Sequence, residues 1–184
     1  MKESIAVNNK LESSIALMSG EQNAEICLNL LKKCLAISGT KIISENLEMN
    51  TSSGSCLTEI TFLSCVDMEN LIIVANEIAE DSIDTINDFT EVMLPFNYKD
   101  DVCTKINRPI IKYSSTNTLA DVVVSEIEKE NEKTKIKMFT DEKEIEMIVN
   151  SNIVLPLECL VALSYAMVKT GIKMKDIIKC VAEL

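Results

Sequence analysis

Residues 153–184 read IVLPLECLVALSYAMVKTGIKMKDIIKCVAEL and make up the most apolar long stretch of the chain. Proline is favoured in the first turn of a helix, where its missing N–H costs nothing, so Pro156 marks a helix start. Apolar residues then recur at helical spacing as far as Val168, and Gly171 suits the position after a helix end. From Ile172 the pattern is amphipathic. The stretch therefore predicts a buried helix followed by a helix that closes the core.

Upstream of this pair, apolar periodicity and turn residues predict alternating helices and strands. The predicted helices are residues 21–38, closed by Gly39; residues 68–80, capped by Asp67; and residues 142–149, capped by Asp141. The predicted strands are residues 40–48, 57–66, 119–127 and 134–139, with one more opened by Pro109. Residues 119–127 and 134–139 form a hairpin pattern, and residues 50–55 and 97–107 are predicted loops. Residues 81–96 fit a helix or a strand.

This order of elements predicts an α+β fold, in which helices cover one face of an antiparallel sheet and a helical pair ends the chain. The length of 184 residues suits one domain. We expect residues 1–20 to form a flexible N-terminal arm or a short helix. Residues 21–184 are predicted to form the single domain.

The charge of the chain is strongly negative, at −11 with a pI near 4.6, and Arg108 is its one arginine. Negative charge disfavours binding to a nucleic-acid backbone or to an anionic membrane. It suits a basic protein partner instead. The chain has no histidine, and so it lacks the most common general base and metal ligand.

The N-terminus is polar and shows no signal-peptide pattern, and residues 153–168 are too short for a membrane span and include Glu158. We therefore expect a cytoplasmic protein. Its seven cysteines, an odd number, are then expected to be reduced and buried. Cys27 and Cys34, seven residues apart on one helix face, could share a ligand, although we interpret them as core residues. No Cys-x-x-Cys pair or histidine completes a zinc site.

Four carboxylates, Asp81, Asp84, Asp88 and Glu91, would share one face of a helix if residues 81–91 were helical. Such a face could coordinate Mg²⁺ or position a water, or it could be a solvated acidic surface. The four glycines are isolated from one another, so no glycine-rich phosphate loop is present. We assign no catalytic, cofactor-binding or metal-binding residue and predict no cofactor.

The segment from Lys169 to Lys179 is basic and contains a glycine turn, as in a helix-turn-helix. DNA contacts through Lys173, Lys175 and Lys179 are one interpretation of this pattern. The acidity of the chain favours the other interpretation, an ordinary corner between two helices.

Two family resemblances follow from these patterns. The N-terminal helix, the strands and the acidic, histidine-free composition together resemble acidic secretion chaperones. The sequence SIDTINDFTEVM, residues 82–93, resembles the helix of CheC/CheX-type chemotaxis phosphatases, which carries a Glu and, three residues on, an Asn. Asp88 and Glu91 stand at these positions, so the Asn that positions water is absent.

The leading hypothesis is a non-enzymatic, cytosolic protein-binding module: an adaptor, a chaperone or an inhibitor of another protein. Acidity and nine methionines, which suit adaptable contacts, favour this interpretation. A homodimer is also compatible with the sequence. The alternative is a divalent-metal-dependent hydrolase or a CheC/CheX-like phosphatase that uses the carboxylates of residues 81–91.

Overall fold

The computed structural model describes residues 11–50, 55–64, 69–76, 78, 80–140, 143–150 and 156–183. Nine strands of these residues form one sheet in the order β2-β3-β1-β4-β5-β6-β7-β8-β9. The strands are β1 (Glu12–Gly20), β2 (Ile42–Asn50), β3 (Ser55–Leu63), β4 (Leu71–Ala75), β5 (Glu91–Pro95), β6 (Ile110–Ser114), β7 (Val122–Glu130), β8 (Lys133–Thr140) and β9 (Glu144–Asn150). The helices are α1 (Glu21–Ser38), α2 (Ile83–Ile86), α3 (Asp100–Cys103), α4 (Leu157–Lys169) and α5 (Met174–Val181), and a short 3₁₀ turn, η1 (Glu80–Ser82), precedes α2.

The sheet is mixed, so the predicted antiparallel α+β fold is wrong. Strands β1, β4, β5, β6 and β7 run parallel to their neighbours in the centre of the sheet. Antiparallel pairs extend it on both sides, β3 and β2 at one edge and β8 and β9 at the other. A parallel centre needs crossover connections over the faces of the sheet, which places this chain closer to the α/β class.

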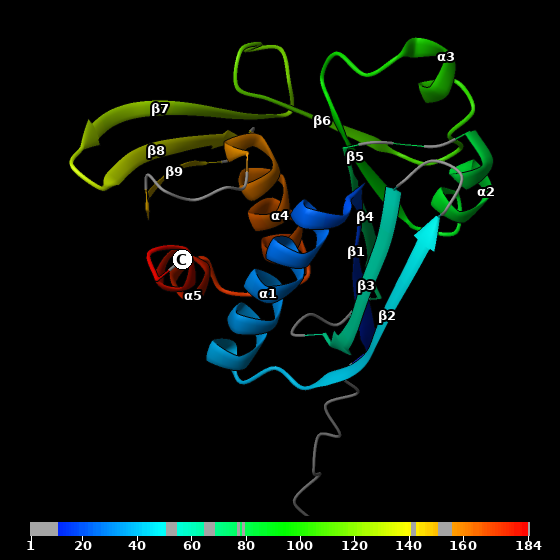
Figure 1. The fold of residues 1–184 in the computed structure, drawn as a ribbon, viewed down its shortest axis with the longest axis horizontal. Helices are drawn as coiled ribbons and strands as arrows, with labels where there is room; N and C mark the ends of the chain where they lie inside the picture. Colours follow the sequence, from blue (N-terminus) through cyan, green and yellow to red (C-terminus); the bar gives the residue numbers. More distant parts are fainter. Residues whose placement is uncertain are drawn as a thin grey trace, which may run out of the picture.

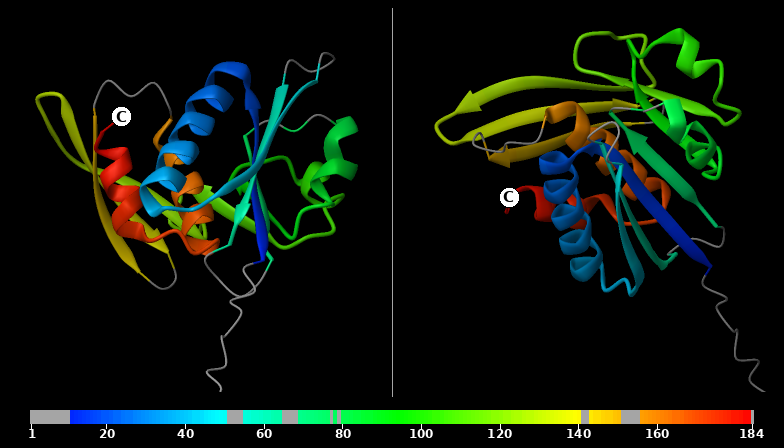
Figure 2. Two further views of the ribbon diagram at one scale, coloured as in Figure 1. Left: turned by 90° about the horizontal axis from the view of Figure 1, so that it is seen from below. Right: turned by 45° about the vertical axis from the view of Figure 1, so that its right-hand side comes forward.

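Helices cover both faces of the parallel strands, again in contrast to the prediction (Figures 1 and 2). Successive residues of a strand point to opposite faces. In β1, Ile15 and Leu17 therefore join the core formed with α1, α4 and α5. Ala16 and Met18 belong to a smaller core, which α2 and α3 cover.

The predicted C-terminal helical pair is confirmed. Helix α4 begins directly after Pro156, and eight of its residues are buried. Gly171 has a φ of 90°, and the Ile172 N–H donates to the Met167 carbonyl at 3.0 Å, which closes the helix end. The amphipathic helix α5 then buries Ile177 against the core.

The predicted helix 21–38 is also confirmed, with identical bounds in α1. Gly39 takes a left-handed conformation, with φ at 69°, and the Thr40 N–H donates to the Leu35 carbonyl at 2.9 Å. The hairpin of residues 119–127 and 134–139 is confirmed as β7 and β8. The strands predicted at residues 40–48, at residues 57–66 and after Pro109 correspond to β2, β3 and β6.

The helices predicted at residues 68–80 and 142–149 are wrong, because these segments contain β4 and β9. Strand β4 lies between two parallel strands, β1 and β5, and helices cover both of its faces. It therefore has the continuous apolar sequence of a buried strand. Such a run resembles a buried helix in its periodicity. The proposed caps, Asp67 and Asp141, lie outside the described residues.

Residues 1–20 are expected to form an arm or a short helix. In the structure, residues 12–20 instead form β1, an inner strand of the sheet. Residues 1–10 lie outside the described part of the chain, and the division into an arm and one domain stays a prediction. Residues 51–54 of the predicted loop also lie outside it. Residues 81–96 contain both candidate structures, the short helix α2 and the strand β5.

Candidate functional site

The four carboxylates that would share one face if residues 81–91 were helical are separated in the structure. Asp81 lies in η1, Asp84 in α2 and Asp88 in the turn after α2, and all three are exposed. Glu91 begins β5 and pairs with Lys169 of α4, with 2.8 Å between Oε1 and Nζ. Residues 81–91, for which the sequence leaves helix and strand open, do not form a single helix, because α2 ends at Ile86 and the chain turns into β5.

This separation also bears on the predicted metal chemistry and on the phosphatase resemblance. Among the described residues, no group of three or more Asp, Glu, Cys or His side chains could hold a metal ion. The resemblance to CheC/CheX-type phosphatases implies that Asp88 and Glu91 lie on one helix. In the structure they do not, because Asp88 follows α2 and Glu91 begins β5.

Asp88 instead borders a hollow between α2 and the β2–β3 hairpin, which we call the acidic pocket. Its volume is about 210 Å³. Three of its side chains are carboxylates, those of Glu48, Glu59 and Asp88. The other lining residues are Asn46, Leu57, Leu71, Thr85 and Phe89.

The register of the β2–β3 hairpin places two of these carboxylates on one face. Glu48 pairs with Leu57, and Asn46 pairs with Glu59. Directly paired residues of antiparallel strands project to the same face, and so do residues two apart. The hairpin therefore presents a carboxylate from each strand to the pocket.

The third carboxylate is positioned by the turn that follows α2. The Asp88 N–H donates to the Thr85 carbonyl at 3.1 Å. The hydroxyl of Thr90 donates to the carbonyl of Leu71 at 2.8 Å, which fastens this turn to β4. Phe89, 6% exposed, lies between the two and gives the pocket an apolar wall.

The three carboxylates of the acidic pocket form no ion pair with any described residue. Glu45 on the same hairpin differs, since its carboxylate lies 2.6 Å from Lys32 of α1. The pocket therefore concentrates negative charge beside apolar surface. This arrangement suits a cation carried on an aliphatic stem, such as a lysine or arginine side chain.

The carboxyl ends of the parallel strands are the usual ligand site of an open α/β sheet. Here β1 ends at Gly20 and α1 begins at Glu21, so no loop of residues separates the strand from the helix. Residues 20–25 read GEQNAE and contain neither a glycine-rich loop nor a lysine. Acidic residues at a helix start disfavour phosphate, which is the anion that such a junction commonly binds.

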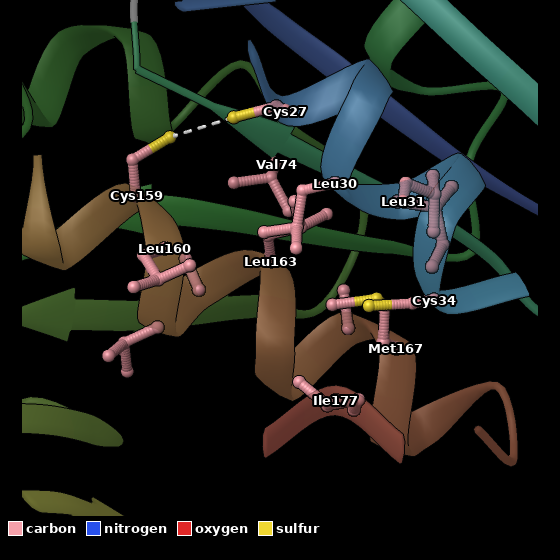
Figure 3. Close-up of a cluster of buried hydrophobic side chains, with 14 of the residues drawn as sticks. Cys27, Leu30, Leu31, Cys34, Val74, Cys159, Leu160, Leu163, Met167 and Ile177 are labelled. Carbon is pink, nitrogen blue, oxygen red and sulfur yellow. Dashed lines mark hydrogen bonds between the residues drawn. The ribbon is translucent and has the colours of Figure 1, made fainter. Parts of the chain in front are cut away.

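A second set of polar groups does meet near these strand ends, and we call it the thiol cluster: Cys27, Asn76, Tyr113 and Cys159. The sulfurs of Cys27 in α1 and Cys159 in α4 lie 3.7 Å apart (Figure 3). Asn76, which follows β4, donates from Nδ2 to the Cys159 sulfur at 3.1 Å, and its Oδ1 accepts from the Tyr113 hydroxyl. Cys27, Cys159 and Tyr113 are at most 2% exposed.

The pKa values of the two thiols in this cluster are shifted in opposite directions. The pKa of Cys159 is lowered because Cys27 hydrogen-bonds to its sulfur and Asn76 donates to it, although burial opposes the shift. The pKa of Cys27 is raised because its proton is held in the bond to Cys159 and because the thiol is buried. Burial also raises the pKa of Tyr113.

Cys27 and Cys34 are both core residues in the structure, in agreement with the interpretation from sequence. They do not share a ligand site, since Cys34 contacts Cys180 of α5. The described cysteines are Cys27, Cys34, Cys56, Cys103, Cys159 and Cys180, and all of them are free thiols.

The three lysines of the helix-turn-helix interpretation are exposed, Lys173 just before α5 and Lys175 and Lys179 on it. The opposite side of α5 faces the core and carries the buried residues Ile177 and Val181. Helix α4 before the turn is largely buried in the core, which fits an ordinary helical corner.

No family model matches the chain, and no curated protein matches it. Among solved structures, it is similar to a murein peptide ligase from Psychrobacter arcticus, with a TM-score of 0.55, 14% identity and coverage of 91% of this chain and 46% of that one. A UDP-N-acetylmuramoyl-L-alanyl-D-glutamate–2,6-diaminopimelate ligase gives a TM-score of 0.50 and 13% identity, over 65% of this chain and 28% of that one. The chain thus spans less than half the length of either ligase. At these identities the likeness concerns the fold.

Membrane-spanning helices are not found in the described part of the chain, where no helix is both long and apolar enough. The cytoplasmic location stays a prediction.

Proposed function

We propose that this protein is a binding module that holds a basic segment of a protein partner, with one lysine or arginine side chain in the acidic pocket. The observation that carries this proposal is the convergence of Glu48, Glu59 and Asp88 on one pocket, with no ion pair to any described residue. The adaptor, chaperone and inhibitor roles are finer forms of the same proposal.

The size of the pocket supports a side chain rather than a small-molecule ligand. Its volume of about 210 Å³ is below the range of roughly 300–1,000 Å³ that is typical of small-molecule sites. An aliphatic stem would contact Leu57, Leu71 and Phe89, while the charged end would reach the carboxylates.

The location of the pocket supports a protein partner. Residues Asn46 and Glu48 belong to β2, which is an edge strand of the sheet. Unpaired backbone groups of an edge strand can bind an extended peptide. The side chains of Ile43 and Leu47 on this strand are 42% and 62% exposed, which gives a partner at this edge an apolar contact. Leu47 lies between Asn46 and Glu48, so it projects to the face of the sheet opposite the acidic pocket. A homodimer through this edge is a further form of the proposal.

The test uses a fluorescent peptide library in which lysine or arginine is flanked by β-forming residues, with the same peptides carrying acetyl-lysine or citrulline as neutral counterparts. We expect the basic peptides to bind and their affinity to fall as salt is raised. The variant with Glu48→Gln, Glu59→Gln and Asp88→Asn should lose about tenfold in affinity, given about 0.2–1 kcal/mol for each exposed charge pair.

The matched control neutralises three exposed carboxylates near the tip of the β7–β8 hairpin, by Glu128→Gln, Glu130→Gln and Glu132→Gln. Both variants change the net charge equally, so the control separates a local site from general attraction. Equal loss in the two variants, or equal binding of the neutral peptides, would contradict the proposal.

The described residues do not favour the metal-dependent hydrolase or phosphatase, because the carboxylates of residues 81–91 are divided among η1, α2, the turn after α2 and β5, and no group of three that could hold a metal ion is found there. That alternative stays a prediction.

A further inference from the structure

Four cysteines lie in two pairs that join α1 to the C-terminal helices. Cys27 faces Cys159 of α4, with 3.7 Å between the sulfurs. Cys34, which lies on the same face of α1 seven residues after Cys27, contacts Cys180 of α5. A pair of thiols in contact can be linked by a small movement, since a disulfide requires an S–S distance near 2.05 Å.

The surroundings distinguish the first pair from the second. The Cys159 sulfur accepts a hydrogen bond from the Asn76 side chain at 3.1 Å, so a negative charge on this sulfur is stabilised. Asn76 is half-buried, and Glu158 next to Cys159 is half-buried as well, which places the pair just beneath the surface. The Cys180 thiol instead donates to the Leu30 carbonyl at 3.8 Å, a contact that favours its protonated form.

We propose that Cys27 and Cys159 form a redox-modification site, in which Cys159 is the thiol that reacts first and Cys27 is the resolving thiol. The oxidant is hydrogen peroxide. The Cys159 thiolate attacks one peroxide oxygen and the O–O bond breaks, which gives a sulfenic acid on Cys159 and, after proton transfer, one water.

The second step links the two helices. The Cys27 sulfur attacks the Cys159 sulfur, the S–O bond breaks, and the hydroxyl leaves with the Cys27 proton as a second water. The pair loses two hydrogens in total and one peroxide is reduced to two waters. A dithiol reductant reverses the link by thiol–disulfide exchange.

The disulfide would tie α1 to α4 across 132 positions of the chain. Closing so long a loop restricts the unfolded chain strongly, so oxidation should raise the midpoint of thermal unfolding.

The test is peptide mapping of the folded protein after treatment with hydrogen peroxide and blocking of the remaining thiols. Trypsin cuts after lysine and arginine, and the sequence places the four cysteines in separate tryptic peptides, residues 11–32, 34–41, 144–169 and 180–184. We expect a dominant cross-link between residues 11–32 and 144–169, lighter by two hydrogens than the sum of the reduced peptides, and its loss on treatment with dithiothreitol.

Variants assign the order of the steps. Cys159→Ser should abolish both the cross-link and the sulfenic acid, whereas Cys27→Ser should leave a sulfenic acid on Cys159 that a dimedone probe captures. Cys103→Ser is the control, because Cys103 is half-buried and lies outside the cluster, and it should keep the cross-link.

Two results would overturn the proposal. One is a wild-type protein in which Cys27 and Cys159 stay reduced under conditions that oxidise Cys103. The other is a mixture of pairings in which residues 34–41 and 180–184 are linked as readily as residues 11–32 and 144–169. Both are read on the wild-type protein, so they do not depend on the folding of a variant.

Discussion

Leu163 allows the packing of the main core to be tested at one position. Its side chain is fully buried in α4 and belongs to the cluster that includes Leu30 of α1 and Val74 of β4 (Figure 3). The substitution Leu163→Ala removes three carbon groups from this cluster. At about 0.8 kcal/mol for each group, the transfer term alone costs about 2.5 kcal/mol.

The cavity left behind adds to this loss, because α1, α4 and β4 hold one another and cannot fully collapse onto it. Leucine-to-alanine changes in cores cost up to about 5 kcal/mol when the site stays open. Alanine favours a helix slightly more than leucine does, so helix propensity works against the expected loss. For a domain of this size, the midpoint of thermal unfolding should fall by roughly 5–20 °C.

The assay is equilibrium unfolding in urea, followed by circular dichroism, for the wild type and the variant. The free energy of unfolding should fall by about 2.5–5 kcal/mol at an unchanged urea dependence. Leu119→Ala is the control, because this leucine is 82% exposed, and it should change stability by less than about 0.5 kcal/mol. A loss below about 1 kcal/mol at Leu163 would refute the packing described here.

Two further predictions concern backbone conformation and alkaline pH. Gly39→Ala should lower the free energy of unfolding by about 1 kcal/mol, because φ is 69° there, whereas Gly20→Ala should change it little, since φ is −57° and its added Cβ would meet no atom within 4 Å. Equal losses at the two glycines in urea unfolding would contradict this account. The pKa values of Cys34 and Tyr113 are raised, chiefly by burial, so their contribution to stability is fully present below the pKa of the unfolded chain and is lost at higher pH. The urea midpoint should therefore fall as pH rises from about 8 to 11, and less steeply in Tyr113→Phe; a flat profile would contradict the burial of these groups.

The helices with strong amphipathic or apolar patterns could be predicted from the sequence. Helix α1 has an apolar face and a glycine at its end, and the C-terminal pair has Pro156 at its start and Gly171 at its turn. The β7–β8 hairpin could be predicted as well, because both strands alternate and a charged tip separates them. These signals are local, so they do not depend on the rest of the fold.

The parallel centre of the sheet could not be predicted, because its order joins segments far apart in the chain. Strand β1 lies between β3 and β4, and its sequence, ESSIALMSG, has small polar residues at both ends that suggest an arm. Strand β4 is short and apolar on both faces, which is also true of a buried helix. The sequence favours α+β because helices are predicted at both ends with antiparallel strands between them, and interpreting residues 12–20 as an arm and residues 68–80 as a helix hides two of the parallel strands.

The acidic pocket could be predicted only in part from the sequence. The sequence singles out Asp88 as a candidate carboxylate, but not Glu48 or Glu59. A hairpin centred on the loop of residues 50–55 indicates the pairing. Residues at equal distances from the middle of this loop face each other, which pairs Asn46 with Glu59 and Glu48 with Leu57. The contact of Cys27 with Cys159 depends on the packing of α4 over α1, which no local pattern indicates.

The cover of β1 by α1, α4 and α5 has a consequence for synthesis on the ribosome. The core face of β1, which carries Ile15 and Leu17, is completed by side chains of residues 157–181. The first strand and helix therefore emerge long before their packing partners, and the main core closes when α4 and α5 have left the exit tunnel. Until then the apolar faces of β1 and α1 are open to other chains, and nascent-chain chaperones are expected to protect them.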